Sequence, residues 1–122
     1  MLNKTVVCSV YDASPKTAQI AARLQENNPV KIQLEGLLGS AVSFVIQAVF
    51  KKIEQPFLVI LQDKEEAAYY LNDLEEILGK EDVLFYPGSF RNPYQIEETD
   101  NANVLLRAEV LNRINSRKKP SI

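Results

Sequence analysis

The sequence predicts an α/β domain in which a parallel sheet is covered by helices. Three observations indicate this fold class. Runs of strand length alternate with runs of helix length three times, the connections are too long for hairpins, and one strand-length run is apolar throughout. Antiparallel strands can be joined by short turns, whereas parallel strands need long crossovers, which are almost always right-handed. We therefore expect a parallel sheet with right-handed helical crossovers.

Five helical segments are predicted, and two of them begin at clear capping signals. Ser14 followed by Pro15 is typical of a helix start, because proline suits the first helical position. Asp63 with Glu66 three residues later resembles a capping box, and Gly79 is expected to end that helix. The predicted helices cover approximately residues 6–11, 15–27, 40–54, 64–78 and 99–115.

Two of these helices carry patterns that predict how they pack. The helix over residues 40–54 is apolar except for a narrow line at helical spacing, so we expect it to be mostly buried. That line consists of Ser43, Gln47, Lys51 and Glu54. In the last helix, Val104, Ala108 and Leu111 share one side.

The predicted strands lie between the helices. Residues 30–34 alternate between apolar and polar, residues 57–61 form a continuous apolar run after Pro56, and residues 83–86 form a third run. A continuous run suits a central strand covered on both faces. Ser121–Ile122 is interpreted as the first step of a further strand. Such a sheet would have one side without a partner, so we expect a piece of a longer protein, truncated at its C-terminus.

Composition excludes several classes of function. The 122 residues suit one domain or part of one, and the net charge of -2 gives no electrostatic reason to bind nucleic acid or an anionic membrane. The chain has no histidine, which excludes Ser-His-Asp and Cys-His catalysis and the usual histidine-based zinc site. Cys8 is the only cysteine, so no internal disulfide is possible. The apolar runs are far shorter than the ~20 residues of a membrane span, and we expect a cytoplasmic protein.

The segment with the most chemical meaning lies between the first predicted strand and the buried helix. Its placement is that of a phosphate-binding loop, which would make the chain a P-loop NTPase-like domain. Glycines let such a loop wrap the phosphates, a lysine reaches the β and γ phosphates, and a Ser or Thr binds magnesium. The residues of this loop are Gly36, Gly39, Ser40, Ala41, Val42 and Ser43.

The loop departs from a working P-loop where charge is needed. Ser43 takes the metal-ligand place, but Val42 stands in the place of the lysine and Ala41 in the place of the glycine before it. A helix N-terminus supplies only about half a positive charge, too little to offset a triphosphate. We therefore interpret the loop as vestigial and expect no catalytic residue, no cofactor and no metal. One alternative is an ordinary glycine-containing turn, and another is a nucleotide-binding domain that tolerates the valine.

Two charged clusters have simpler interpretations than a site. The acidic cluster is expected to be a solvated helix face, and the basic cluster is expected to complement the dipole at a helix end. A role for the basic cluster in binding a phosphate backbone is the alternative. The acidic residues are Asp73, Glu75 and Glu76, and the basic residues are Arg113, Arg117, Lys118 and Lys119.

The order and spacing of several segments resemble a known family. The segments are residues 33–41 before an apolar helix, 55–60, 67–74 in an acidic helix, 84–87, and the helix with Arg107, Leu111 and Ile114. Over about residues 14 to 122 they resemble the N-terminal module of the transcription-repair coupling factor family (Mfd). That module is similar to the first domain of the excision-repair protein UvrB, so the resemblance implies a UvrB domain 1a type of fold. It divides the chain into an N-terminal extension, residues 1–13, and a partial UvrB-like domain, residues 14–122.

The resemblance implies a non-catalytic scaffold domain, part of a module that recruits UvrA to RNA polymerase stalled at DNA damage. UvrA would be contacted mostly outside this segment, and RNA polymerase and DNA through other domains of an ATP-dependent DNA translocase. In UvrB the matching loop is an intact P-loop, and a long hairpin clamps DNA. Here the lysine place holds Val42, and residues 88–94 are too few for that hairpin. A nucleotide-binding or DNA-binding UvrB/helicase-like domain is the alternative function.

Overall fold

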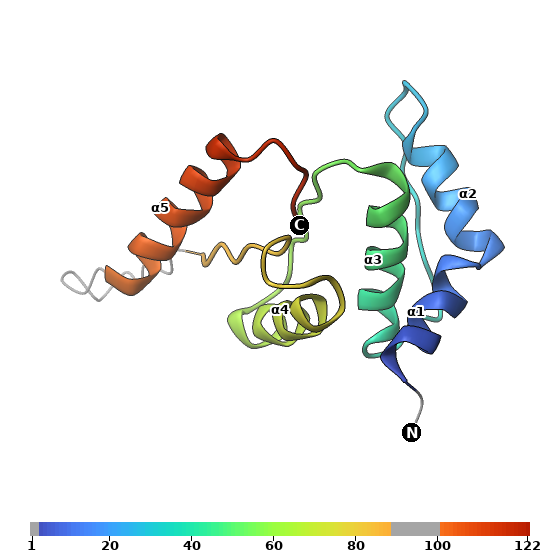
Figure 1. The fold of residues 1–122 in the computed structure, drawn as a ribbon, viewed down its shortest axis with the longest axis horizontal. Helices are drawn as coiled ribbons and strands as arrows, with labels where there is room; N and C mark the ends of the chain where they lie inside the picture. The colour runs from blue at the N-terminus through green and yellow to red at the C-terminus, as the bar shows by residue number, and fades with distance from the viewer. Residues whose placement is uncertain (1–2, 89–100) are drawn as a thin grey trace.

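A computed structural model describes the fold of residues 3–88 and 101–122. Five helices account for all the regular secondary structure of these residues (Figure 1). They are α1 (Lys4–Asp12), α2 (Pro15–Leu24), α3 (Ala41–Ile53), α4 (Lys64–Leu78) and α5 (Asn101–Ser116). Within the described parts of the chain, no helix combines the length and the apolar character needed to cross a bilayer.

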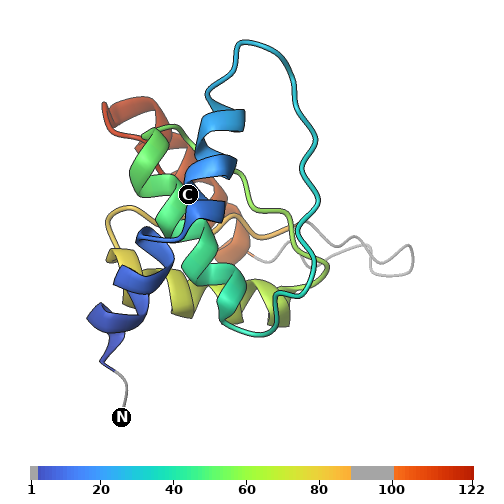
Figure 2. The same ribbon diagram turned by 90° about the vertical axis from the view of Figure 1, so that its right-hand side faces the viewer.

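The prediction of an α/β, parallel-sheet, P-loop NTPase-like domain is wrong, because none of the described residues forms a strand. The first predicted strand, residues 30–34, lies in the long loop that returns from α2 to α3 (Figure 2). Ile32 is 40% exposed and Leu34 is 47% exposed. A strand is stable only when its main chain pairs with a neighbour, and this loop makes no backbone hydrogen bond to another described segment.

The other predicted strands, residues 57–61 and 83–86, are extended but do not pair with each other. Each instead makes main-chain hydrogen bonds to Ser121 or Ile122, which lie between them. Two residues are too few to form a ladder. The sequence pattern therefore indicated two extended segments. It could not show whether a neighbouring strand pairs with them.

The predicted helices are confirmed within the described residues, while the predicted start of the last helix at residues 99–100 lies outside them. Local signals explain several helix ends. The Asp63 carboxylate accepts a hydrogen bond of 2.8 Å from the Glu66 amide at the start of α4. Glu66 reaches back to the amide of Gln62 rather than to that of Asp63, a variation on the capping box. Gly79 ends α4 with a φ of 96°, which favours glycine. Ser14 takes the cap position of α2 before Pro15, but its side chain makes no capping hydrogen bond.

Helix α3 is the centre of the molecule and contacts α1, α2 and α4. Two apolar clusters lie on different sides of it. The cluster towards α2 contains Ala21, Val49 and Ile53. The cluster towards α4 contains Phe50 and Leu74 together with Val83 and Ile122 from the extended segments, and Phe57 and Val59 pack against it.

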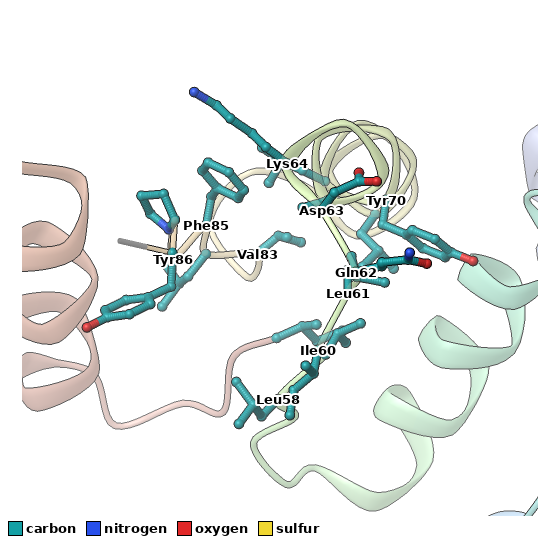
Figure 3. Close-up of a pocket in the computed structure, with 18 of the residues that line it drawn as sticks. Leu58, Ile60, Leu61, Gln62, Asp63, Lys64, Tyr70, Val83, Phe85 and Tyr86 are labelled. Atoms are coloured by element: carbon teal, nitrogen blue, oxygen red, sulfur yellow. The ribbon is translucent and has the colours of Figure 1, made fainter. Parts of the chain in front are cut away.

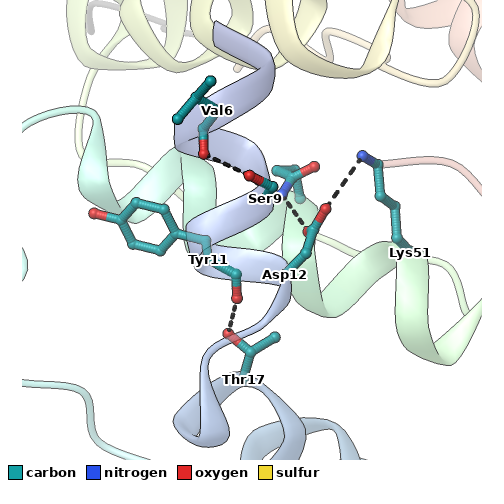
Figure 4. A network of polar contacts seen from close by, with 7 residues as sticks. Val6, Ser9, Tyr11, Asp12, Thr17 and Lys51 are labelled. Atoms are coloured by element: carbon teal, nitrogen blue, oxygen red, sulfur yellow. Dashed lines mark hydrogen bonds and ion pairs between the residues drawn. The ribbon is translucent and has the colours of Figure 1, made fainter. Parts of the chain in front are cut away.

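The polar line of α3 lies inside the molecule at its first two positions. Ser43 and Gln47 are both 0% exposed, while Lys51 and Glu54 are exposed. Gln47 donates a hydrogen bond of 2.8 Å from Nε2 to Asp12 Oδ1 in α1, and Lys51 Nζ lies 3.9 Å from Asp12 Oδ2 (Figure 4). The helix is mostly buried, as predicted, and part of its polar face is buried as well because α1 and α4 supply polar partners.

Helix α5 lies apart from α1, α2 and α3 (Figure 1). Val104, Ala108 and Leu111, which share one side of this helix, are all exposed, and Val110 is its buried apolar residue among those described. Two arginine side chains connect α5 to the segment that follows α4. The Arg107 guanidinium lies 5.0 Å from the centre of the Tyr86 ring.

Candidate functional site

The backbone of the loop before α3 uses amides that a phosphate would need. Gly36 and Gly39 have φ values of 82° and 54°, so both take conformations that favour glycine. The Ala41 amide donates to the Leu38 carbonyl at 3.2 Å, and the Val42 amide donates to the Gly39 carbonyl at 3.4 Å. Anions bind at helix N-termini because the first amides have no partner there. Two of those amides are already engaged within this loop.

The hydroxyl groups of the loop are engaged as well, by side chains of α4. The Ser40 and Tyr69 hydroxyls are 2.8 Å apart and share a hydrogen bond. The Ser43 hydroxyl donates to Asp73 Oδ2 at 3.3 Å. Ser43 takes the place of a magnesium ligand in the sequence pattern, but its oxygen faces a carboxylate and is shielded from solvent. The sequence-predicted loop residues thus lie together, against α4 rather than around an open cradle.

The charges around this loop oppose a phosphate. A small cavity of about 160 Å³ beside Ser40 is lined by Lys4, Phe44, Asp73, Glu76 and Ile77. Two acidic residues and one lysine therefore line the cavity beside this loop. Val42 adds no charge, so the sum of the nearby side-chain charges is negative. A carboxylate repels an anion, and one helix N-terminus supplies only about half a positive charge to attract it.

The charged clusters are placed differently from each other. Asp73 is turned towards α3 by its bond to Ser43, whereas Glu76 is exposed. At the end of α5, Arg117 pairs with Asp82 at 2.8 Å and also donates to the carbonyl of Glu81. No group of three or more potential metal-ligating His, Cys, Asp or Glu side chains occurs in the part of the chain that the structure describes.

A large groove, which the sequence reasoning missed, lies between the extended segments 57–61 and 83–88. It has a volume of about 930 Å³ and is also lined by α4 and Ile122 (Figure 3). Leu58 and Ile60 are each 84% exposed, although the continuous apolar run predicted a strand covered on both faces. Phe57 and Val59, on the alternate positions, pack on the core. Exposed and packed positions thus alternate with a period of two. The sequence does not show this alternation because all five residues of the run are apolar.

Tyr70 is the titratable residue of the groove whose pKa is clearly displaced. Burial raises the pKa of Tyr70 above its ordinary value of 10.0, and the neighbouring Glu66, Tyr69 and Asp73 raise it further. At neutral pH the Tyr70 hydroxyl therefore stays protonated and uncharged. Most of the side chains that line the groove are apolar, and Tyr70, Tyr86, Gln62, Asp63, Lys64 and Asn103 add polar groups. Among its described residues the groove lacks an activated nucleophile beside a base.

Comparison with known proteins gives no relative: no family model matches the chain, and no curated protein or solved structure is significantly similar to it.

Proposed function

We propose that this chain is a non-catalytic scaffold domain in the UvrA-recruiting module of a transcription-repair coupling factor. The resemblance in the order and spacing of its segments supports the choice of family. The lack of histidine, and the raised pKa that keeps the Tyr70 hydroxyl of the groove protonated at neutral pH, support the absence of catalysis. Two of the five resembling segments lie in helices, residues 67–74 in α4 and the segment with Arg107, Leu111 and Ile114 in α5, and residues 33–41 lead into α3.

The observation that carries the non-catalytic part of this proposal is the hydrogen bond from Ser43 to Asp73. A magnesium–nucleotide complex would need the Ser43 oxygen to bind the metal and would place phosphates near the Asp73 carboxylate. Val42 supplies no cation to offset that carboxylate. Nucleotide binding here would cost both the existing hydrogen bond and the repulsion between negative charges.

Titration with ATP and magnesium tests this part. We expect no saturable heat of binding for the unaltered chain at micromolar concentrations. The matched variant Val42→Lys with Asp73→Asn restores the cation and removes the opposing charge. Any gain in affinity in that variant would locate the cause in these two positions. Saturable micromolar binding by the unaltered chain would contradict the proposal.

The DNA-binding alternative is weakened by the way the basic cluster is used. Arg117 is paired with Asp82, and Arg113 donates to the Glu81 carbonyl at 3.4 Å, so both are directed at the protein. Phosphate contacts make DNA affinity fall steeply with salt concentration. We expect weak duplex binding with a shallow salt slope. A steep negative slope would favour the DNA-binding alternative.

Capture of UvrA tests the scaffold role. The unaltered chain is compared with a longer form that also carries the following domain of a coupling factor. This addition is roughly 150 residues, which is the size of one further domain. The resemblance implies that the principal contact surface lies in that domain, so only the longer form should retain UvrA. Equal retention of UvrA by the unaltered chain would show that the contact surface does not lie mainly in the added domain. No retention by either form would contradict the family assignment.

A further inference from the structure

Helix α5 carries apolar side chains on two of its sides. On the side towards its own chain, Val110 is buried. On another side Val104 and Leu111 are 51% and 53% exposed, and Ala108 is exposed between them. These three residues are spaced i, i+4 and i+7, so they form one stripe on the helix surface. A surface helix needs one apolar side to pack on its own domain, and a second apolar side indicates a further partner.

The groove between the segments 57–61 and 83–88 is a second apolar surface that the described chain leaves open. Leu58 and Ile60 are each 84% exposed there, and Leu58 points away from α3 (Figure 3). The stripe of α5 does not line the groove, since Asn103 is the residue of α5 that does. Two turns of helix, about 11 Å long and about 10 Å wide, fill roughly 850 Å³. The groove, with a volume of about 930 Å³, therefore has room for two turns of a helix.

The direction of α5 beside its own groove follows from its contacts. In the first half of α5, Arg107 lies over the ring of Tyr86. Near the end of α5, Arg113 donates to the carbonyl of Glu81. The helix therefore runs opposite to the segment 81–88. A second helix that packs antiparallel to α5 along the groove would end near residue 88.

The charges at that end of the groove favour this antiparallel arrangement. Both walls of the groove begin at their hydrogen bonds to residues 121–122, so α4 starts at the same end as residue 88. Residues 63–66 there are exposed and comprise three acidic residues and one lysine, so their net charge is negative. Lys118 and Lys119, which follow α5, are exposed and positive. Complementary charges of this kind fix the orientation of an interface.

We propose that two copies of this chain associate by inserting the α5 stripe of each copy into the groove of the other. The stripe contacts Leu58 and Ile60 of the other copy, in the helix-in-groove mode of recognition. Because α5 borders the groove of its own chain, one two-fold axis covers both grooves at once, and the assembly closes at two copies. This inference goes beyond the scaffold role and does not depend on the coupling-factor assignment.

The occupant of the groove is a second copy rather than the chain's own α5. Val104 lies about a third of a turn around the helix from Val110. Turning the stripe into the groove of the same chain would expose Val110 and break the contacts of Arg107 and Arg113. A second copy covers the stripe and leaves these contacts in place.

Sedimentation equilibrium tests the association. We expect a monomer–dimer equilibrium with a dissociation constant of roughly 10–100 μM, because small apolar surfaces have to offset the lost freedom of two bodies. Leu111→Glu in the stripe and Ile60→Glu in the groove should each raise the dissociation constant by about tenfold or more. Both positions are exposed, so circular dichroism should show unchanged helix content.

The matched control is Val10→Glu. It places the same charge on a valine of α1 that is 64% exposed and lies away from α5 (Figure 1). It should change the dissociation constant by less than about twofold. A chain that stays monomeric at about 500 μM would overturn the proposal. An effect of Val10→Glu equal to that of Leu111→Glu would overturn it as well.

Cross-linking identifies which surfaces meet. One chain carries only Ile60→Cys, and a second chain, of distinguishable mass, carries only Leu111→Cys. On mild oxidation of their mixture, disulfides between unlike chains should predominate, because only those two positions come within bonding reach. The unaltered chain, in which Cys8 is buried, is the control and should stay unlinked.

Two cross-linking results would overturn the proposal. Predominance of disulfides between like chains would show that the copies meet through other surfaces. A chain that carries both Ile60→Cys and Leu111→Cys should form linked dimers. A disulfide within one such chain would instead show that its own α5 occupies the groove.

Discussion

The two sides of α3 differ in how the main chain of the segments packed against them is paired. On the side of α1 and α2, apolar side chains are buried in one cluster, and Gln47 is held by Asp12. On the side of the extended segments, Phe57 and Val59 pack inwards while Leu58 and Ile60 are exposed. Main-chain amides along both walls of the groove also lack partners in the described residues.

This difference shows that apolar burial and main-chain pairing are separate requirements. A helix pairs its own backbone, so α1 and α2 need only pack one face. An extended segment has to borrow its pairing from a neighbour. The groove side has the apolar residues of a strand region, but Ser121 and Ile122 are the only described residues that supply pairing between its walls.

The largest expected effect separates two leucines on the groove side. Leu74 is 3% exposed in the core, and Leu74→Ala should lower the free energy of unfolding by about 2–5 kcal/mol. Leu58 is 84% exposed, so Leu58→Ala should change it by less than about 0.5 kcal/mol. Urea unfolding followed by circular dichroism measures both. Similar losses of stability for the two variants would mean that Leu58 is buried in solution, which would contradict its exposed position in the groove.

The next effect concerns the buried polar contact on the other side of α3. Asp12→Ala removes the acceptor of Gln47 Nε2, and the other amide atom, Gln47 Oε1, has no hydrogen-bond partner in the described structure. Leaving the buried amide without a partner should cost about 1–3 kcal/mol.

Two control variants separate the hydrogen bond from the ion pair. Asp12→Asn retains an acceptor oxygen and should cost less than Asp12→Ala. Lys51→Ala removes only the exposed contact of 3.9 Å to Asp12 and should cost about 0–1 kcal/mol. If Lys51→Ala proved as destabilising as Asp12→Ala, the ion pair rather than the buried amide would hold α1 to α3.

The sequence predicted the helices because their signals are local. Pro15, Asp63 and Gly79 mark helix ends through their own backbone and side-chain chemistry, and each lies at the end that it predicted. The strands were predicted from the same kind of local pattern, but a strand also depends on a distant partner. The apolar run of residues 57–61 therefore appeared to be a central strand, although its neighbours do not complete a ladder.

The sequence predicted which residues form the candidate loop, but it did not predict which side chains contact them. The sequence shows that Val42 replaces a lysine and that Ser43 stands in a metal-ligand place. It does not show that Asp73, 30 residues away, accepts the Ser43 hydroxyl. Likewise Asp12, which lies 35 residues before Gln47, could not be identified as its partner. Helical spacing located this polar line, and only the tertiary arrangement determines whether it is exposed or buried.

A smaller effect compares two predicted caps, one on each side of the molecule. Asp63→Ala removes the hydrogen bond to the Glu66 amide and should destabilise the protein by about 1 kcal/mol. Ser14→Ala removes a side chain that makes no capping bond, so it should cost less than about 0.5 kcal/mol. Thermal unfolding of the two variants measures the difference. An equal loss would show that Ser14 caps α2 in solution.

The smallest effect uses the pH dependence of stability to examine the groove wall. Because the folded state raises the pKa of Tyr70, it holds the phenol proton at a pH where the unfolded chain has lost it. This contribution to stability is fully present below the ordinary value of 10.0 and is lost as pH rises through the folded value. Tyr70→Phe removes the proton, so its free energy of unfolding should fall less between pH ~9 and ~11 than that of the unaltered chain. Ultraviolet titration of the phenols should show that the same substitution removes a group titrating above the ordinary value. If the two proteins lose stability in parallel, Tyr70 is as solvated as a phenol in the unfolded chain, and the groove wall around it is more open than the structure indicates.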